Sequence, residues 1–205
     1  KLIVILIFAT SALATAAEPP KTEPIFAAAD WLYTPIPANP VLDEHSAEII
    51  SHLKTGKHVA VIRAFGVEIV HPEEITADTP RYEVMFSKTG EWGPHPFGVD
   101  KMPWPDGTII PPGSDGMSAV VDPVSGWAYG VWQQTTPRDG LIHASWGGRV
   151  RMDGDAREPQ PGGRSTGAGI ARRAGVITLN EVRAAAAGDV DAIKHALVFA
   201  TDMST

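Results

Sequence analysis

The sequence predicts a mostly β protein, an antiparallel β-sandwich or jelly roll with one N-terminal helix and one or two short C-terminal helices. Short runs rich in β-branched and aromatic residues fill the middle of the chain. Turn-forming segments rich in Pro, Asp and Gly separate these runs. Many short strands with few helices between them favour a sandwich or jelly roll over alternating strands and helices.

The first residues have the order of a secretory signal peptide. The basic Lys1 precedes an apolar run at residues 2–13, and small residues follow at 14–16. The apolar run is shorter than the roughly 20 residues that a membrane-spanning helix needs. We therefore expect a signal peptide at residues 1–16, a secreted or periplasmic protein, and no membrane span in the mature chain.

The rest of the chain is predicted to form one domain. Residues 17–40 are rich in Pro and Ala, which predicts an extended lead-in and not packed structure. Without the leader, roughly 190 residues remain, enough for one good core and short for two. We expect a single β-sandwich domain at residues 41–205. Its last apolar run, at 196–199, lies so close to the final residue that we expect the domain to be truncated at its C-terminus.

Composition narrows the partners and the source of stability. The chain contains no Cys although export is predicted, so its stability must come from packing and not from disulfides. A formal charge of -7 argues against a nucleic-acid partner, because phosphate binding needs a concentrated basic surface. The small groups of arginines, at residues 149–151 and 164–173, are typical of a solvated face.

The elements follow in order along the chain. Ala47, Ile50 and Leu53 lie three apart, and Gly56 follows, which predicts an amphipathic helix at residues 43–54. Thr178 and Glu181 fit the capping box of a helix that stops at Gly188. A short turn at residues 190–193 precedes a predicted last strand at 195–201. The other predicted strands are 58–62, 67–70, 82–86, 118–121, 127–132, 141–146 and 150–152.

A long loop at residues 90–116 is rich in proline and carries four aromatic or imidazole rings. Loops of this length usually have a role. Two interpretations stay open, because the rings either pin the loop to the body of the protein or line a groove. The rings are Trp92, His95, Phe97 and Trp104.

Common catalytic and metal-binding motifs are absent from the sequence. It has no phosphate-binding loop of the GxxxxGK[ST] type, no GxSxG, no HExxH and no Cys for a zinc ribbon. No cofactor is expected. A calcium site stays open, since several aspartates lie in or beside turns, but Asx turns explain each of them equally well. These aspartates are Asp115, Asp122, Asp139, Asp153 and Asp155.

Two other groups of residues are candidates for chemistry. His143 and His195 lie inside apolar strand patterns, where a histidine either serves as an acid or base or is held by a neighbouring carbonyl. Trp127 and Tyr129 share one face of a predicted strand, and Trp132 points to the other. Such aromatic rings either belong to the core or stack on sugar rings.

The order of several motifs resembles a known family. The segments Gly113-Ser-Asp-Gly116, Tyr129-Gly-Val-Trp-Gln133, Ala144-Ser-Trp-Gly147 and His195-Ala-Leu197 are similar to a largely uncharacterised family of secreted bacterial proteins, common in actinobacteria. The resemblance covers most of the chain from Asp43. It implies a β-sandwich similar to the concanavalin-like glucanases and polysaccharide lyases, and hence a link to carbohydrate that rests on fold analogy. Family members often carry an Asp in the stretch that is 165–169 here, and this chain has no carboxylate there.

The sequence therefore suggests a secreted carbohydrate-active protein that acts on a polysaccharide or oligosaccharide. A hydrolase would need two carboxylates roughly 5 to 10 Å apart, and Asp115 with Asp122 is the candidate pair. A lyase would need a base such as His195. The alternative is a non-catalytic carbohydrate-binding or structural exported domain. The candidate ligand-binding residues in either case are Tyr129, Trp132, Gln133, Trp146 and Arg149.

Overall fold

The computed structural model describes residues 25–27, 31–56, 65–158 and 164–197. Within these ranges the protein is mostly β, with one four-stranded sheet, one three-stranded sheet and two α-helices. This confirms the predicted mostly β fold. The predicted signal peptide, the predicted strand at 58–62 and the end of the predicted strand at 195–201 lie outside the described residues.

The elements have the following bounds. The strands are β1 (Val67–Val70), β2 (Arg81–Phe86), β3 (Met102–Pro103), β4 (Met117–Asp122), β5 (Trp127–Trp132), β6 (Leu141–Ala144) and β7 (Trp146–Arg151). The helices are α1 (Ser46–Thr55) and α2 (Leu179–Ala186), with short 3-10 turns at η1 (Trp31–Tyr33) and η2 (Pro72–Glu74). None of the described helices is long and apolar enough to cross a membrane.

Both sheets contain parallel and antiparallel strand pairs. The prediction of a purely antiparallel sandwich is therefore wrong. The larger sheet has the order β1-β4-β5-β7 and the smaller one has the order β3-β2-β6. β4, β5 and β7 pair antiparallel, but β1 pairs with β4 in parallel, and so does β2 with β6. The chain leaves β1 for the smaller sheet and returns to the larger one at β4. Such a crossover brings the second strand back in the same direction.

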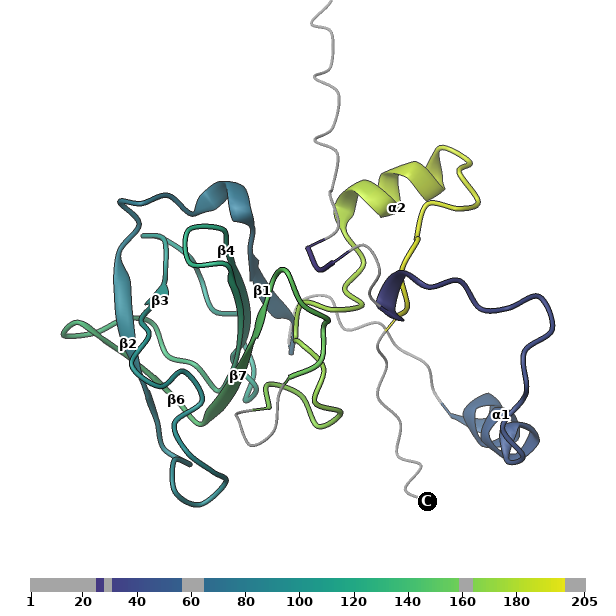
Figure 1. Cartoon of the computed structure of the whole chain (residues 1–205), viewed down its shortest axis with the longest axis horizontal. Coiled ribbons are helices and arrows are strands. Elements are labelled where there is room, and N and C mark those ends of the chain that lie inside the picture. The colour runs from purple at the N-terminus through teal and green to yellow at the C-terminus, as the bar shows by residue number, and fades with distance from the viewer. Residues whose placement is uncertain (1–24, 28–30, 57–64, 159–163, 198–205) are drawn as a thin grey trace, which may run out of the picture.

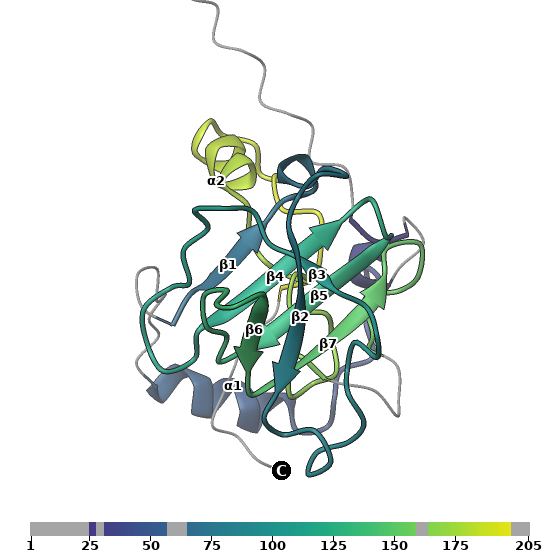
Figure 2. The same ribbon diagram turned by 90° about the vertical axis from the view of Figure 1, so that its left-hand side faces the viewer.

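The main core lies between the sheets. Figure 2 shows β2, β3 and β6 lying in front of the larger sheet. Apolar side chains from both sheets fill the space between them, including Val84, Val120 and Ile142, none of which is measurably exposed. Phe97 and Trp104 of the long loop are also buried in this core. These two rings therefore pin the loop to the body of the protein.

A sharp corner joins β6 to β7 at Ser145. Gln133, after the end of β5, has a positive φ of 54°, and its side-chain Oε1 accepts a hydrogen bond of 2.6 Å from the Ser145 hydroxyl. Strands that pass from one sheet to another often bend in this way. The corner brings Trp132 and Trp146 together, because these two residues are partners in the β5–β7 register.

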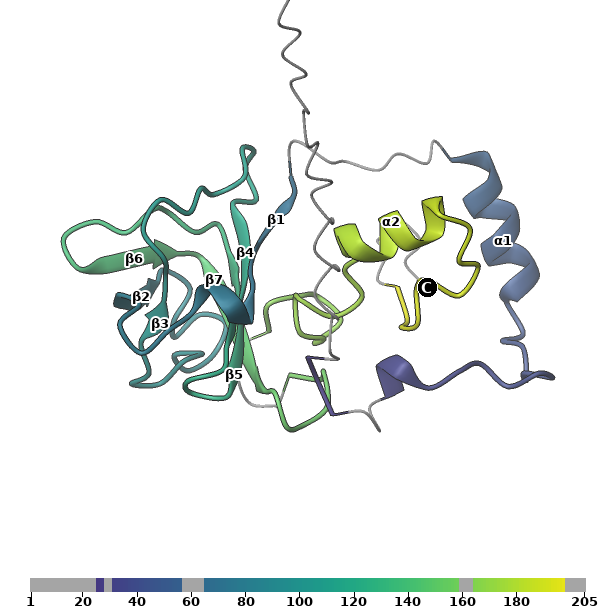
Figure 3. The same ribbon diagram turned by 90° about the horizontal axis from the view of Figure 1, so that it is seen from above.

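A second apolar cluster covers the outer face of the larger sheet. Figures 1 and 3 show the C-terminal segment with α2 on the side of this sheet that faces away from β2, β3 and β6. Ala128 and Val150 supply the sheet side of the cluster. The segments packed on them contribute Phe26, Leu32, Ala156, Ala171 and Ala174.

The two helices differ in how they are held. α2 begins as its capping box predicts, with the Thr178 hydroxyl accepting from the Glu181 backbone and the Glu181 carboxylate accepting from the Thr178 backbone. α1 has no side-chain cap hydrogen bond at its N-cap residue His45. Neither helix has a buried residue, so the predicted apolar face of α1 is not packed in a core here.

Candidate functional site

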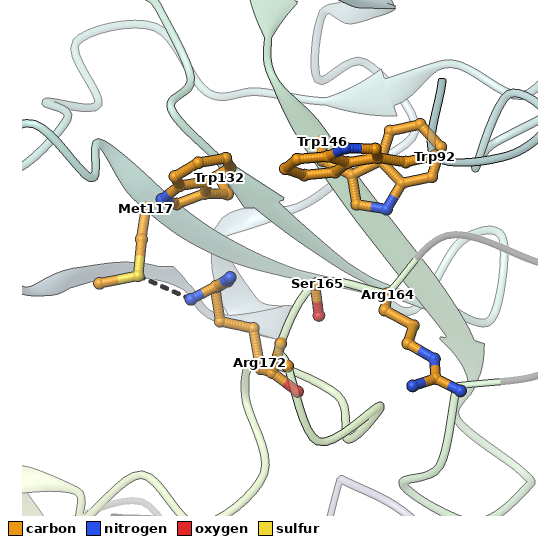
Figure 4. Close-up of a pocket in the computed structure, with 9 residues that line it drawn as sticks. Trp92, Met117, Trp132, Trp146, Arg164, Ser165 and Arg172 are labelled. Atoms are coloured by element: carbon orange, nitrogen blue, oxygen red, sulfur yellow. Dashed lines mark hydrogen bonds between the residues drawn. The ribbon is translucent and has the colours of Figure 1, made fainter. Parts of the chain in front are cut away.

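A pocket of about 550 Å³ opens on the outer face of the larger sheet, beside the corner. We call it the tryptophan pocket. Figure 4 shows three indoles along one wall and two arginines on the opposite side. The lining residues are Trp92, Met117, Trp132, Trp146, Arg164, Ser165, Thr166, Gly167 and Arg172.

The indole wall is built from two strands and a loop. Trp132 ends β5 and Trp146 begins β7, so the corner fixes both. Trp92 comes from the long loop, and its ring lies 6.0 Å from that of Trp132 in a stacked arrangement with an interplanar angle of 15°. Its ring also meets Trp146 edge to face at 5.9 Å. Such contacts hold aromatic rings in fixed orientations, and 49% of Trp92 remains exposed.

The opposite wall is the segment at residues 164–172, which approaches the sheet closely because Gly130 lacks a side chain. A Cβ placed at Gly130 would lie 2.5 Å from both Cβ and Oγ of Ser165 and 2.9 Å from Cβ of Arg172. Contacts shorter than 3 Å between such atoms are not tolerated, so only glycine permits this packing. Gly130 thereby sets the width of the pocket.

Arg172 supplies an incompletely paired positive charge. One of its terminal nitrogens donates a hydrogen bond to the thioether sulfur of Met117, which is a weak acceptor. Its Nε is buried and has no hydrogen-bond partner among the residues that the structure describes. Burial lowers the pKa of Arg172, and the charges of Glu158 and Asp115 act against this lowering. An anionic oxygen in the pocket would give this guanidinium a much stronger partner.

A buried carboxyl lies behind the pocket wall. Glu158 is 6% exposed and accepts a hydrogen bond of 2.8 Å from the backbone of Ser165 and a second one from the Ser165 hydroxyl. Burial raises the pKa of Glu158 from its ordinary value of 4.5 to about 7, although these hydrogen bonds and the charge of Arg172 act to lower it. Glu158 therefore exchanges its proton near neutral pH.

Asp115 and Gln133, both predicted site residues, lie at the edge of the tryptophan pocket. Asp115 Oδ1 accepts a hydrogen bond of 3.4 Å from the indole nitrogen of Trp132. Gln133 uses both ends of its amide within the corner, since its nitrogen donates to the carbonyl of Ser114 at 3.2 Å and its oxygen accepts from Ser145. Both residues thus position the indole wall.

Asp122 lies elsewhere, at the far end of β4. Its side chain is fully buried and bonds the Arg81 guanidinium through both oxygens, at 2.8 and 3.1 Å. Burial alone would raise the pKa of Asp122, but the hydrogen bonds from Arg81 and Ser125 and the charge of Arg81 lower it below its ordinary value. At roughly 3.4 Å per residue, the two ends of β4 are about 17 Å apart. Asp115 and Asp122 therefore do not flank one glycosidic bond.

His195 is in a third place, beside α2. Its Nε2 lies 2.9 Å from a carboxylate oxygen of Glu181, and its Nδ1 lies 2.9 Å from the carbonyl of Ala196. The structure thus gives Asp115, Asp122 and His195 three separate environments. They do not form one catalytic group. His143, the other candidate histidine, is exposed on β6.

Two of the predicted ligand-binding residues face away from the tryptophan pocket. Tyr129 is 2% exposed and packs against Phe97 in the main core. Arg149 is its partner on β7, pairs with Asp100, and places its guanidinium 4.3 Å from the ring centre of Trp127. Of the other three, Trp132 and Trp146 line the pocket, and Gln133 lies at its edge.

The sequence did not indicate the cationic wall of this site. Arg164 and Arg172 belong to a group of arginines whose spacing is typical of a solvated face, so the sequence does not predict their place in a pocket. Glu158 belongs to no motif, because an isolated Glu carries no spacing signal. The stretch at 165–169 has no carboxylate of its own, and in the structure Glu158 bonds to Ser165 from outside it.

The described residues contain no group of three or more His, Asp or Glu side chains that could hold a metal ion. The turn aspartates have local partners instead. Asp122 accepts a hydrogen bond of 3.0 Å from the backbone of Val124, and Asp155 accepts one of 3.0 Å from the backbone of Arg157. Comparison with known protein families, with curated proteins and with solved structures finds no match for this chain.

Proposed function

We propose that this is a secreted protein that binds an acidic polysaccharide or oligosaccharide in the tryptophan pocket. The observation that carries the proposal is the pairing of three indoles with the guanidiniums of Arg164 and Arg172 across one pocket. Indole faces pack against the apolar C–H faces of sugar rings, and a few polar groups fix the orientation of the ligand. A volume of about 550 Å³ is within the range of small-ligand sites.

The guanidiniums favour an acidic sugar over a neutral one. A carboxylate on the sugar ring forms paired, charge-assisted hydrogen bonds with arginine, which a hydroxyl group cannot match. The protein as a whole is acidic, with a formal charge of -7. The two arginines of the pocket are therefore a local positive site on an acidic protein, which favours an anionic ligand there.

Membership in the family of secreted bacterial β-sandwich proteins is part of this proposal. The facing sheets and the export-type N-terminus support it. The carbohydrate link that this family resemblance implies agrees with the chemistry of the pocket.

A catalytic role is the second candidate, and Glu158 is the observation that favours it. A carboxyl that exchanges its proton near pH 7 has the property that a general acid or base needs. A lyase would then use Glu158, next to a pocket whose arginines neutralise a uronate. Binding is the first candidate because Glu158 is only 6% exposed, bonds to Ser165 and does not line the tryptophan pocket.

Binding assays with charged and neutral polysaccharides test the proposal. We expect polygalacturonate or alginate to retard the protein in affinity gels, and neutral dextran and laminarin to leave it unaffected. Trp132→Ala should weaken the binding at least about tenfold, as is usual for a central tryptophan. Arg172→Gln should weaken it similarly and reduce its dependence on salt.

The controls lie away from the pocket. Trp127→Ala removes an indole from the opposite face of β5, and Arg138→Gln removes an exposed charge on a turn. Both should bind like the unaltered protein, provided that circular dichroism shows them folded. Equal affinity of all variants would contradict the proposal. Unsaturated products absorbing in the ultraviolet, lost in Glu158→Gln, would instead establish the lyase.

A further inference from the structure

A second pocket, of about 410 Å³, adjoins the tryptophan pocket. It is built from the turn η1, from residues 157–158 and from the far side of the loop at 164–170. Arg164 lines both pockets. The other residues around the second pocket are Trp31, Arg157, Glu158, Ala168, Gly169 and Ile170.

The wall between the two pockets is firmly held. Ser165 faces the tryptophan pocket, Glu158 faces the second pocket, and two hydrogen bonds join them. The Thr166 hydroxyl donates to the carbonyl of Ile170 at 2.8 Å and accepts from its amide at 3.1 Å. The backbone of Glu158 donates to the carbonyl of Gly169 at 2.8 Å. The two pockets therefore keep a fixed relation to each other.

The second pocket pairs an indole with guanidiniums as the first does, and unlike the first it is also lined by a carboxyl, that of Glu158. Its indole is Trp31, and the guanidinium carbon of Arg157 lies 5.5 Å from the centre of that ring. The Arg157 side chain is 65% exposed, and its nearest carboxylate contact is a long one of 3.9 Å to Asp155. An indole next to an accessible guanidinium is again a surface for a ring that carries a negative charge.

Arg164 lines both pockets and so connects the cations of one with those of the other. The tryptophan pocket contains Arg172 and Arg164, and the second pocket contains Arg164 and Arg157. A ligand passing from one pocket to the other would thus meet Arg172, Arg164 and Arg157 in turn. A polymer with one carboxylate on each sugar presents charges in such a series, whereas a single small anion uses only one of these positions.

We infer that the second pocket is a further subsite for the same acidic glycan chain, with Trp31 as its platform and Arg164 as the cation between the two subsites. This inference rests on the proposed function, which concerns the tryptophan pocket alone. It makes the ligand an oligomer long enough to occupy both pockets. Because binding in one pocket raises the effective concentration of the rest of the oligomer at the other, affinity should rise as the oligomer reaches the second subsite.

A length series of oligogalacturonates, from the monomer upward, tests the inference by titration calorimetry. We expect the affinity of the unaltered protein to rise with length until both pockets are filled. Trp31→Ala should weaken binding of the long oligomers about tenfold and leave that of the shortest binding oligomer unchanged. Trp132→Ala should weaken binding at every length.

Arg157→Gln is a second test of the subsite, and it does not alter the apolar cluster that Trp31 packs against. Trp31 belongs to the outer apolar cluster, so its loss can disturb folding, whereas the exposed Arg157 can be replaced without removing a core contact. We expect Arg157→Gln to lower the affinity of long oligomers only, and Arg138→Gln, the charge-matched control, to have no effect.

The two possible failures are distinguishable. If short oligomers bind and lose affinity in Trp132→Ala, but the rise with length persists in both Trp31→Ala and Arg157→Gln, the second subsite is overturned and the proposed function stands. If no oligomer of any length binds, the proposed function is overturned, and the subsite with it.

Discussion

At the scale of single residues, two buried carboxylates have opposite electrostatic roles. Asp122 is neutralised by a two-pronged bond from Arg81, which lowers its pKa. Glu158 has hydrogen-bond donors in Ser165 but lies in a buried site that raises its pKa to about 7. The first arrangement stabilises a fold at neutral pH, and the second weakens it there, because a carboxylate charge is costly in a site without a direct ion pair.

Asp122→Asn should lower the free energy of unfolding by about 3 kcal/mol at pH 7, because it leaves the Arg81 guanidinium without its counter-charge. The lowered pKa of Asp122 means that its contribution is present above its ordinary pKa of 3.8 and is lost as the pH falls through the folded value. Urea unfolding measures the difference, with the exposed Asp106→Asn as control. An equal loss in both variants would contradict the structural role given to Asp122.

Glu158 gives the opposite pH dependence. Its folded pKa of about 7 exceeds the ordinary 4.5, so its favourable contribution is complete below pH 4.5 and is lost as the pH rises through about 7. The difference corresponds to about 3 kcal/mol. Glu158→Gln, which resembles the protonated form, should remove this pH dependence from urea unfolding between pH 5 and pH 8. Glu83→Gln, at an exposed position on β2, should retain it. A slope unchanged in Glu158→Gln would refute the assignment.

At the scale of elements, the sequence predicts what neighbouring residues decide. The capping box at Thr178 and Glu181 is a local signal, and α2 begins there. The run at 127–132 predicts β5 and the opposite faces of Tyr129 and Trp132, because alternation along a strand is also local. In each case the physical cause lies within a few residues of its effect.

The pairing of strands is not a local property. The parallel partners β1 and β4 meet only because the chain crosses to the smaller sheet between them, and no pattern in either strand encodes that route. The same holds for the candidate site. Trp132 and Trp146 were predicted from their strands, whereas Arg172 enters the site because its segment docks over Gly130. Its own neighbours in the sequence do not reveal this contact.

At the scale of the whole molecule, the larger sheet carries a core on each face. The inner core joins the two sheets, and the outer cluster fastens the N-terminal turn and the segment after β7 to the same strands. The tryptophan pocket lies where this outer layer ends and the corner begins. The strands and the long loop supply its indoles and the docked segment supplies its cations, so the site exists only while the two layers are together.

Gly130→Ala tests this dependence without any ligand. The added methyl group would lie 2.5 Å from Ser165 and 2.9 Å from Cβ of Arg172, atoms too close to the backbone to rotate away, so the docked segment must move off the sheet. We expect a loss of about 1 to 3 kcal/mol in stability. Hydrogen exchange should show faster exchange at the amides of Ser165 and Ala171, which bond Glu158 and Ala156, and unchanged protection in β4.

Gly167→Ala is the matched control, since a Cβ at Gly167 meets no atom within 4 Å although the residue lines the same pocket. It should leave both stability and exchange unaltered. If Gly130→Ala also left the exchange of the docked segment unaltered, the close contact over Gly130 would not be what holds the cationic wall against the sheet. The joint construction of the pocket from two layers would then be wrong.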